Sequence, residues 1–358
     1  MGQPARLVDD PVDDEPLIDW DVAVATARRL VPAGPSVPRE EAESTVHRLR
    51  EHAVTAEGHV RSLTGLDDGH PPRPADVVDR PGWIGAAADG LRAMIPARMP
   101  VRSGPRAARR IAARTAGAQT GVALAFLGSR VLGQYDPFGG PEAAPGRLLL
   151  VAPNIVAVQR ALDVPAEDFR MWVCLHEVTH RLQFNAVPWL REHFAGEVRA
   201  FLAGAGDPDT LVGMLGRLPE ALRAARRDRV RDSIGLLALL QAPEQQAALD
   251  RLLALATLLE GHADHVMDAV GPPVVPSVER IRRRFTARRQ GGGLAERLLR
   301  ALLGMDAKLR QYAEGAAFTR HVVDAVGMDG FNAVWTSPQT LPSRAEIVDP
   351  AAWLRRVP

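Results

Sequence analysis

Residues 174–182 read CLHEVTHRL and contain two histidines four positions apart, with a glutamate directly after the first. On a helix, residues four apart lie about 40° from one another around the axis and one turn along it. His176 and His180 can therefore bind the same metal ion. Glu177 projects beside them, where it can hold and deprotonate a metal-bound water. This pattern is typical of a catalytic zinc site.

A third ligand is needed, because catalytic zinc takes three protein ligands and keeps a further position for water. The stretch ALATLLEGHADHVMD, residues 254–268, has a helical pattern and contains Glu260, which we predict to be that ligand. Asp264 lies four residues later on the same helical face, so we predict that it accepts the outer ring N–H of a ligand histidine. His262 and His265 lie off that face.

A hydrolase also needs a hydrogen-bond donor for the negative charge that develops on the carbonyl oxygen. Tyr135 and Tyr312 are the only tyrosines in the chain, and no motif surrounds either of them. Histidines are the other option, at His265 or His321. We take Tyr312 and His265 as the candidate donors. The alternative for both is ordinary packing or a place on the surface.

The composition argues against several classes of protein. The 358 residues carry a formal net charge of +1, which gives no overall attraction to nucleic acid or to anionic lipid. The single cysteine, Cys174, excludes an intramolecular disulfide and is expected to be buried among apolar residues. The first 20 residues lack an apolar signal segment, and the longest apolar stretches are too short to span a bilayer. We expect a cytoplasmic protein with no membrane partner.

The periodicity of apolar residues predicts a mainly α fold with one small β element beside the metal-binding helix. Residues 1–16 are acidic and are expected to form a disordered lead. A helical N-terminal domain is predicted over 17–134, and a catalytic domain over 135–358. Within the latter, RLLLVAPN (147–154) is an apolar run that predicts a strand. Residues 169–184 are apolar nearly all round and predict a buried central helix.

Several segments resemble one known family. HExxH followed on a later helix by Glu-x-x-x-Asp is similar to the gluzincin branch of zinc metallopeptidases. The segments LLLVAPN, DVPAEDFRMWVCLHEVTHRLQF, LLEGHADHVMDAVG, VVPSVERIRRRF and GMDGFNAVWTSPQTLPSRAEI resemble the type 2 zincin-like metallopeptidases of actinobacteria. Members of that family are often labelled as associated with deazaflavin coenzyme biosynthesis. The resemblance covers most of the chain from Ile18.

The resemblance implies a zincin-like metallopeptidase fold and zinc (Zn2+) as the cofactor. Matched residue by residue, His176, His180 and Glu260 correspond to the zinc ligands, Glu177 to the general base and Asp264 to an outer partner of the site. In zincins an extended peptide lies along an edge strand. The strand predicted at 147–154 is either that edge strand or part of the core.

The leading hypothesis is a zinc-dependent hydrolase, most simply a peptidase, that acts on a peptide or a small amide. Its alternative is a catalytically inactive zincin-fold scaffold or partner-binding protein. A third reading is a di-iron helical bundle, since Glu177-x-x-His180 also fits Glu-x-x-His. That fold requires a second such pair, and the sequence contains none. No phosphate-binding or dinucleotide-binding loop points to deazaflavin chemistry.

Overall fold

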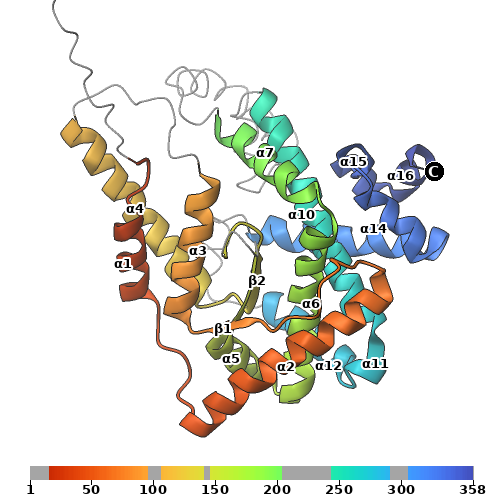
Figure 1. The fold of residues 1–358 in the computed structure, drawn as a ribbon, viewed down its shortest axis with the longest axis horizontal. Coiled ribbons are helices and arrows are strands. Elements are labelled where there is room, and N and C mark those ends of the chain that lie inside the picture. Colours follow the sequence, from red (N-terminus) through yellow and green to blue (C-terminus); the bar gives the residue numbers. More distant parts are fainter. Residues whose placement is uncertain (1–15, 96–105, 141–145, 204–242, 291–304, 358) are drawn as a thin grey trace, which may run out of the picture.

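The computed structural model describes residues 16–95, 106–140, 146–203, 243–290 and 305–357 (Figure 1). The predicted disordered lead, 1–16, lies outside these ranges except for its last residue. The fold is mainly α with one small sheet, as predicted. The helices are α1 (Trp20–Leu30), α2 (Arg39–Thr64), α3 (Arg80–Met94), α4 (Arg106–Gly128), α5 (Ala152–Leu162), α6 (Ala166–Ala186), α7 (Leu190–Ala203), α10 (Pro243–Ala269), α11 (Gly271–Val274), α12 (Val278–Gln290), α14 (Met305–Phe331), α15 (Arg344–Val348) and α16 (Pro350–Arg356). Two 3-10 helices, η2 (Asn332–Trp335) and η3 (Pro338–Thr340), follow α14.

Within the described ranges the sheet has three strands: β1 (Asp76–Val78), β2 (Gly133–Asp136) and β3 (Arg147–Val151). Their order is β1-β3-β2, with β3 parallel to β1 and antiparallel to β2. The strand predicted from the apolar run is thus β3, and it is the central strand rather than an edge strand. The edge on the side of helix α6 is β2, whose short sequence GQYD carries no clear strand pattern.

The apolar core formed by the described residues has two parts, and β3 contributes side chains to both. Side chains alternate between the two faces of a strand. Leu148 and Leu150 accordingly belong to the larger cluster with α2, α6, α10 and α14, while Leu149 and Val151 belong to a smaller cluster with α1, α3 and α4. The larger cluster includes Leu49, so apolar contacts cross the predicted boundary between 134 and 135. The division into two domains stays a prediction.

Helix α6 is the buried helix that the sequence predicts. Pro165 precedes it, and Glu167 and Asp168 lie in its first turn, where negative charge favours a helix start. It packs against α2, α10, α7 and β2 (Figure 1). None of the helices in the described part of the chain has the length and apolar character needed to cross a membrane.

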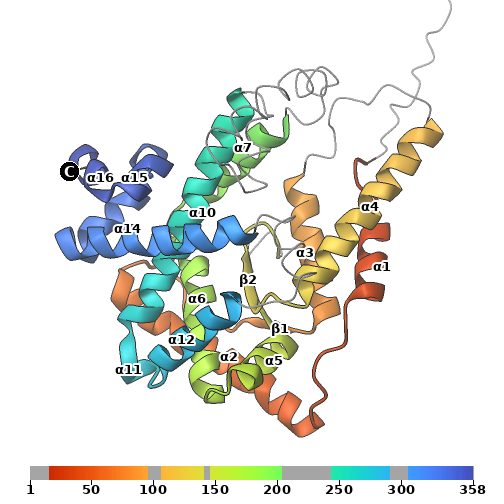
Figure 2. The ribbon, with the colours of Figure 1, turned by 180° about the vertical axis from the view of Figure 1, so that it is seen from behind.

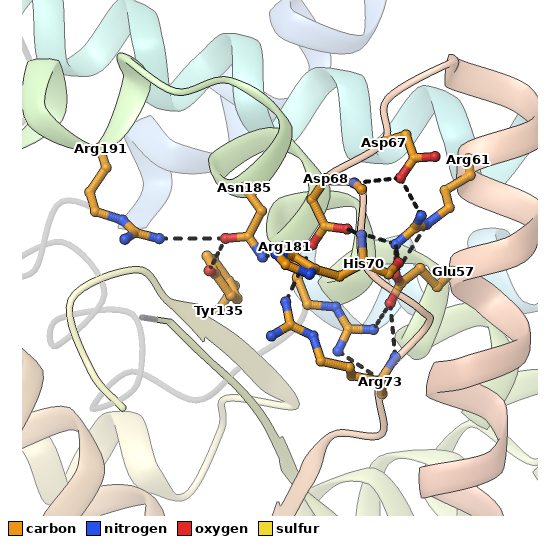
Figure 3. A network of polar contacts seen from close by, with 11 residues as sticks. Glu57, Arg61, Asp67, Asp68, His70, Arg73, Tyr135, Arg181, Asn185 and Arg191 are labelled. Carbon is orange, nitrogen blue, oxygen red and sulfur yellow. Dashed lines mark hydrogen bonds and ion pairs between the residues drawn. The ribbon is translucent and has the colours of Figure 1, made fainter. Parts of the chain in front are cut away.

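Buried charges join α2 to α6 (Figure 3). Arg181 of α6 forms an ion pair with Glu57 of α2, and both side chains are almost fully buried. Arg181 also donates to the carbonyl oxygen of Arg73 at 2.9 Å, and Arg61 reaches both Glu57 and Asp68. Removing one member of a buried pair leaves the other charge unpaired, which destabilises a fold strongly. The network therefore fixes how α6 is rotated against α2.

Helices α10 and α14 cross each other (Figure 2). Their backbones are in contact at two glycines. A Cβ added to Gly261 would lie 2.1 Å from the carbonyl carbon of Gly315, and one added to Gly315 would lie 2.1 Å from the carbonyl oxygen of Thr257. Such distances are far inside van der Waals contact, so only glycine allows this approach. Gly261 directly follows Glu260, so the crossing also places that carboxylate.

Replacing Gly261 by alanine should force the two helices apart. We expect Gly261→Ala to lower the free energy of unfolding by about 2 kcal/mol or more, as overpacking of a close contact does. Chemical denaturation of the purified protein measures this. Gly58→Ala is the matched control, since Gly58 is an exposed position inside α2 with open space around it. The control should be neutral or stabilising, and a Gly261→Ala protein as stable as wild type would contradict the crossing.

Candidate metal centre

Three possible metal-binding atoms from two helices lie within 3.8 Å of one another. The Nε2 atoms of His176 and His180 lie 3.2 Å apart. The Oε2 atom of Glu260 lies 3.3 Å from the first and 3.8 Å from the second. Helix α6 supplies both histidines and α10 supplies the glutamate, which are the three residues predicted from the sequence. Among the described residues this is the group of histidines and carboxylates arranged to hold a metal ion.

The arrangement fits a zinc-sized cation. The circle through these three donor atoms has a radius of about 2.0 Å, which matches the length of zinc–nitrogen and zinc–oxygen bonds. The Oε2 atom of Glu260 is buried and faces the Nε2 atoms of both histidines, where a cation would balance its charge. Two imidazoles and one carboxylate form a donor set that zinc prefers, and catalytic zinc takes a water as its further ligand.

The pKa values of Glu260 and His180 are shifted by the groups around them. Burial opposes ionisation of Glu260, but hydrogen bonds from His176 and His180 outweigh it and hold the pKa of the carboxyl well below its usual value. Burial likewise opposes a charge on His180. The hydrogen bond to Glu260 and the negative charges of Glu260 and Glu177 outweigh that burial and raise the pKa of His180 to about 9. Without a metal, a proton on His180 thus balances the carboxylate, and a divalent cation would take its place.

The outer ring nitrogens of the two histidines have partners that the sequence analysis missed. The Nδ1 atom of His180 lies 2.9 Å from Oε1 of Gln183, and Nδ1 of His176 lies 3.2 Å from Sδ of Met267. Gln183 is three residues after His180 on the same helix, so its spacing was the available signal. The described contacts of Asp264 are with Arg282, at 3.8 Å between Oδ2 and Nη1 and 3.2 Å between the backbone oxygen and Nη2. They do not bring it to either ligand histidine, and its predicted role stays a prediction.

Glu177 is buried beside the edge strand β2. A Cβ added to Gly133, the first residue of β2, would lie 2.6 Å from Cγ of Glu177, so the strand backbone touches the glutamate side chain. Tyr135 of the same strand donates to Oδ1 of Asn185 on α6 at 2.6 Å (Figure 3). These two contacts hold β2 against the helix that carries the histidines. Sequence reasoning missed Gly133, because its role depends on a strand that the pattern did not reveal.

The two candidate donors for the carbonyl oxygen are not brought to the three metal-binding atoms by any described contact. His265 is half-buried on α10, where burial and Arg320 lower its pKa and Asp324 partly offsets them. Both of these charged neighbours belong to α14. Tyr312 also belongs to α14, but its side chain lies outside the described part of the chain. Cys174 is fully buried, as predicted, and burial raises the pKa of its thiol.

His262 contacts Gln183, the partner of His180, and was not assigned a role from the sequence. It is fully buried, with its ring 5.0 Å from that of Phe331 and 5.6 Å from that of Trp335. Its Nδ1 atom lies 3.0 Å from Nε2 of Gln183. Burial, together with the nearby positive charges that His265 and His180 can carry, lowers the pKa of His262 to about 3, so the ring is neutral.

Comparisons with known proteins agree with this geometry. The family model described as zincin-like metallopeptidase matches residues 18–354. A crystal structure from Chloroflexus aurantiacus, described as a proposed hydrolase with a novel fold, is 30% identical in sequence, with a TM-score of 0.67. That match covers 95% of this chain and 98% of the other. A search of curated proteins found no match.

The family model and the structural neighbour cover nearly the whole chain, including both ligand-bearing helices. They confirm the predicted fold class, but they do not support the actinobacterial and deazaflavin labels. With two histidines and a glutamate converging as a zincin requires, the chain belongs to the zincin-like metallopeptidase family.

Proposed function

We propose that this protein is a zinc-dependent hydrolase whose substrates are peptides or small amides. The observation that carries the proposal is the convergence of His176, His180 and Glu260 on one point, with Glu177 on the same helix as the two histidines. Membership of the family and the likeness to a proposed hydrolase support it.

In this proposal His176, His180 and Glu260 bind the metal, and Glu177 is the general base. Zinc, when bound, supplies a Lewis acid that lowers the pKa of water toward about 7 and polarises a carbonyl group. The carboxylate of Glu177 takes a proton from the attacking water and passes it to the leaving nitrogen. Burial of Glu177 keeps its carboxylate in place, and the contact with Gly133 limits where it can move.

The strand β2 is the place where an extended substrate would lie. It is an edge strand among the described residues, and its backbone touches the side chain of Glu177. A peptide that pairs with this edge by β-addition would bring a backbone carbonyl next to the general base. We therefore assign to β2 the role that the sequence analysis considered for the strand at 147–154.

Glu177→Gln tests the role of the general base. The amide cannot accept the proton, so we expect hydrolysis to fall about 10²–10⁴-fold while zinc stays bound. Cleavage of a broad peptide library, read by mass spectrometry, and the zinc content of the same samples measure the two effects. Glu192→Gln is the control, because Glu192 is exposed on α7 and undergoes the same chemical change.

The outcome of that experiment separates the enzyme from the alternative. A wild-type protein that holds zinc but cleaves nothing in the library would favour the inactive scaffold. Full activity in Glu177→Gln would contradict the assigned base.

Gly133→Ala tests the contact between β2 and Glu177. The new methyl group would collide with the Glu177 side chain and displace its carboxylate, and a misplacement of about 1 Å can lower a rate roughly a hundredfold. We expect kcat/KM to fall by that order while the zinc content is unchanged. Gly196→Ala on α7, where the added methyl meets open space, is the control. Wild-type activity in Gly133→Ala would show that β2 does not constrain the base.

A further inference from the structure

Gln183 is a fully buried residue of α6 that faces α10. These two helices carry the metal ligands. Its Nε2 atom lies 3.0 Å from the carbonyl oxygen of Leu259 and 3.0 Å from Nδ1 of His262. Its Oε1 atom lies 2.9 Å from Nδ1 of His180. One amide thus contacts a metal-binding histidine, the backbone next to the third ligand and a second buried histidine.

The direction of each hydrogen bond follows from the carbonyl group of Leu259. A backbone carbonyl can only accept, so the group facing it must be the NH2 of Gln183. The second N–H of that NH2 is left for Nδ1 of His262, which must be unprotonated. The Oε1 atom of Gln183 can only accept, so the proton of the remaining bond belongs to Nδ1 of His180. The nitrogen of His180 that is left to bind a cation is Nε2, the atom that faces Glu260.

The contact with Gln183 distinguishes histidine from other aromatic residues at position 262. Its position between Phe331 and Trp335 suits any aromatic ring, and phenylalanine would fill the same space. A phenylalanine would leave one N–H of the buried Gln183 amide without a partner, which is costly in a place closed to water. The acceptor at Nδ1 of His262 therefore orients the amide, while the Nε2–H of the same ring is buried and has no hydrogen-bond partner among the described residues.

We propose that Gln183 and His262 are positioning residues for the metal centre. Gln183 holds His180 in the Nδ1–H tautomer, and its bond to Leu259 joins α6 to the residue before Glu260. His262 holds Gln183 in the orientation that makes this possible. The inference rests on the proposed zinc site, since a fixed tautomer matters only when Nε2 of His180 binds a metal.

The first test measures the zinc affinity of the full-length protein by competition with a chelator. Gln183→Leu removes every bond of the amide, and we expect zinc to bind about 10–100-fold more weakly, as is usual when a partner of a ligand histidine is lost. Gln245→Leu is the matched control, because Gln245 is a buried glutamine on α10 whose side chain donates to the carbonyl oxygen of Phe201 at 3.4 Å. The control should bind zinc as wild type does.

A pair of variants at His262 separates positioning from packing. His262→Phe keeps an aromatic ring between Phe331 and Trp335 but removes the acceptor, so zinc affinity should fall. His262→Asn offers an oxygen near the place of Nδ1 and should restore part of the affinity. If both variants lower the thermal stability of the metal-free protein and neither changes zinc affinity, the role of His262 is structural and the proposal is wrong.

The tautomer can also be measured without any substitution. In ¹⁵N spectra of the zinc-loaded wild-type protein, His180 should carry its proton on Nδ1 and bind through Nε2. Binding through Nδ1 would overturn the proposal, as would wild-type affinity in Gln183→Leu. If Gln183→Leu does not fold, the zinc affinities of His262→Phe and His262→Asn and the wild-type ¹⁵N spectrum test the proposal. A wild-type protein that binds no zinc would overturn the proposed function first, and this inference with it.

Discussion

The structure depends on holding two imidazoles and a carboxylate together within a largely apolar protein interior. Such groups are costly to bury unless they are paired or bind a cation, so their positions must be imposed by the surrounding fold. Here His180 and Glu260 come from helices α6 and α10, and each helix is fixed by a different contact. The ion pair of Arg181 ties α6 to α2, the amide of Gln183 ties α6 to α10, and the backbone contact at Gly261 ties α10 to α14.

The polar side chains of α6 are spread over about half of its circumference, because residues three and four positions apart lie about 60° and 40° from one another. Glu177 faces the edge strand β2, His180 faces the other metal-binding residues, Arg181 faces α2, and Gln183 faces α10. A helix that is surrounded on all sides can hold each of these side chains against a separate neighbour. This explains why α6 is buried nearly all round even though it carries charged residues.

The parts of the site that the sequence predicted are those with a local pattern. His176 and His180 are four apart on one helix, and Glu260 lies in a helical stretch where a carboxylate is otherwise hard to explain. The apolar run of β3 likewise predicted a strand. By contrast, Gln183 and His262 are 79 residues apart and meet only when α6 and α10 pack. The placement of Gly133 at the general base depends on a three-stranded sheet whose edge strand has no pattern of its own.

Every role assigned above depends on the binding of zinc by two residues of α6 and one of α10. Its most direct measurement is the zinc content of purified protein after dialysis, for wild type and for Glu260→Ala. One zinc per chain is expected for wild type, and its loss is expected in Glu260→Ala, because two histidines alone bind zinc weakly. Glu244→Ala, an exposed position at the start of the same helix, should keep the zinc. One full equivalent of zinc in Glu260→Ala would contradict the account.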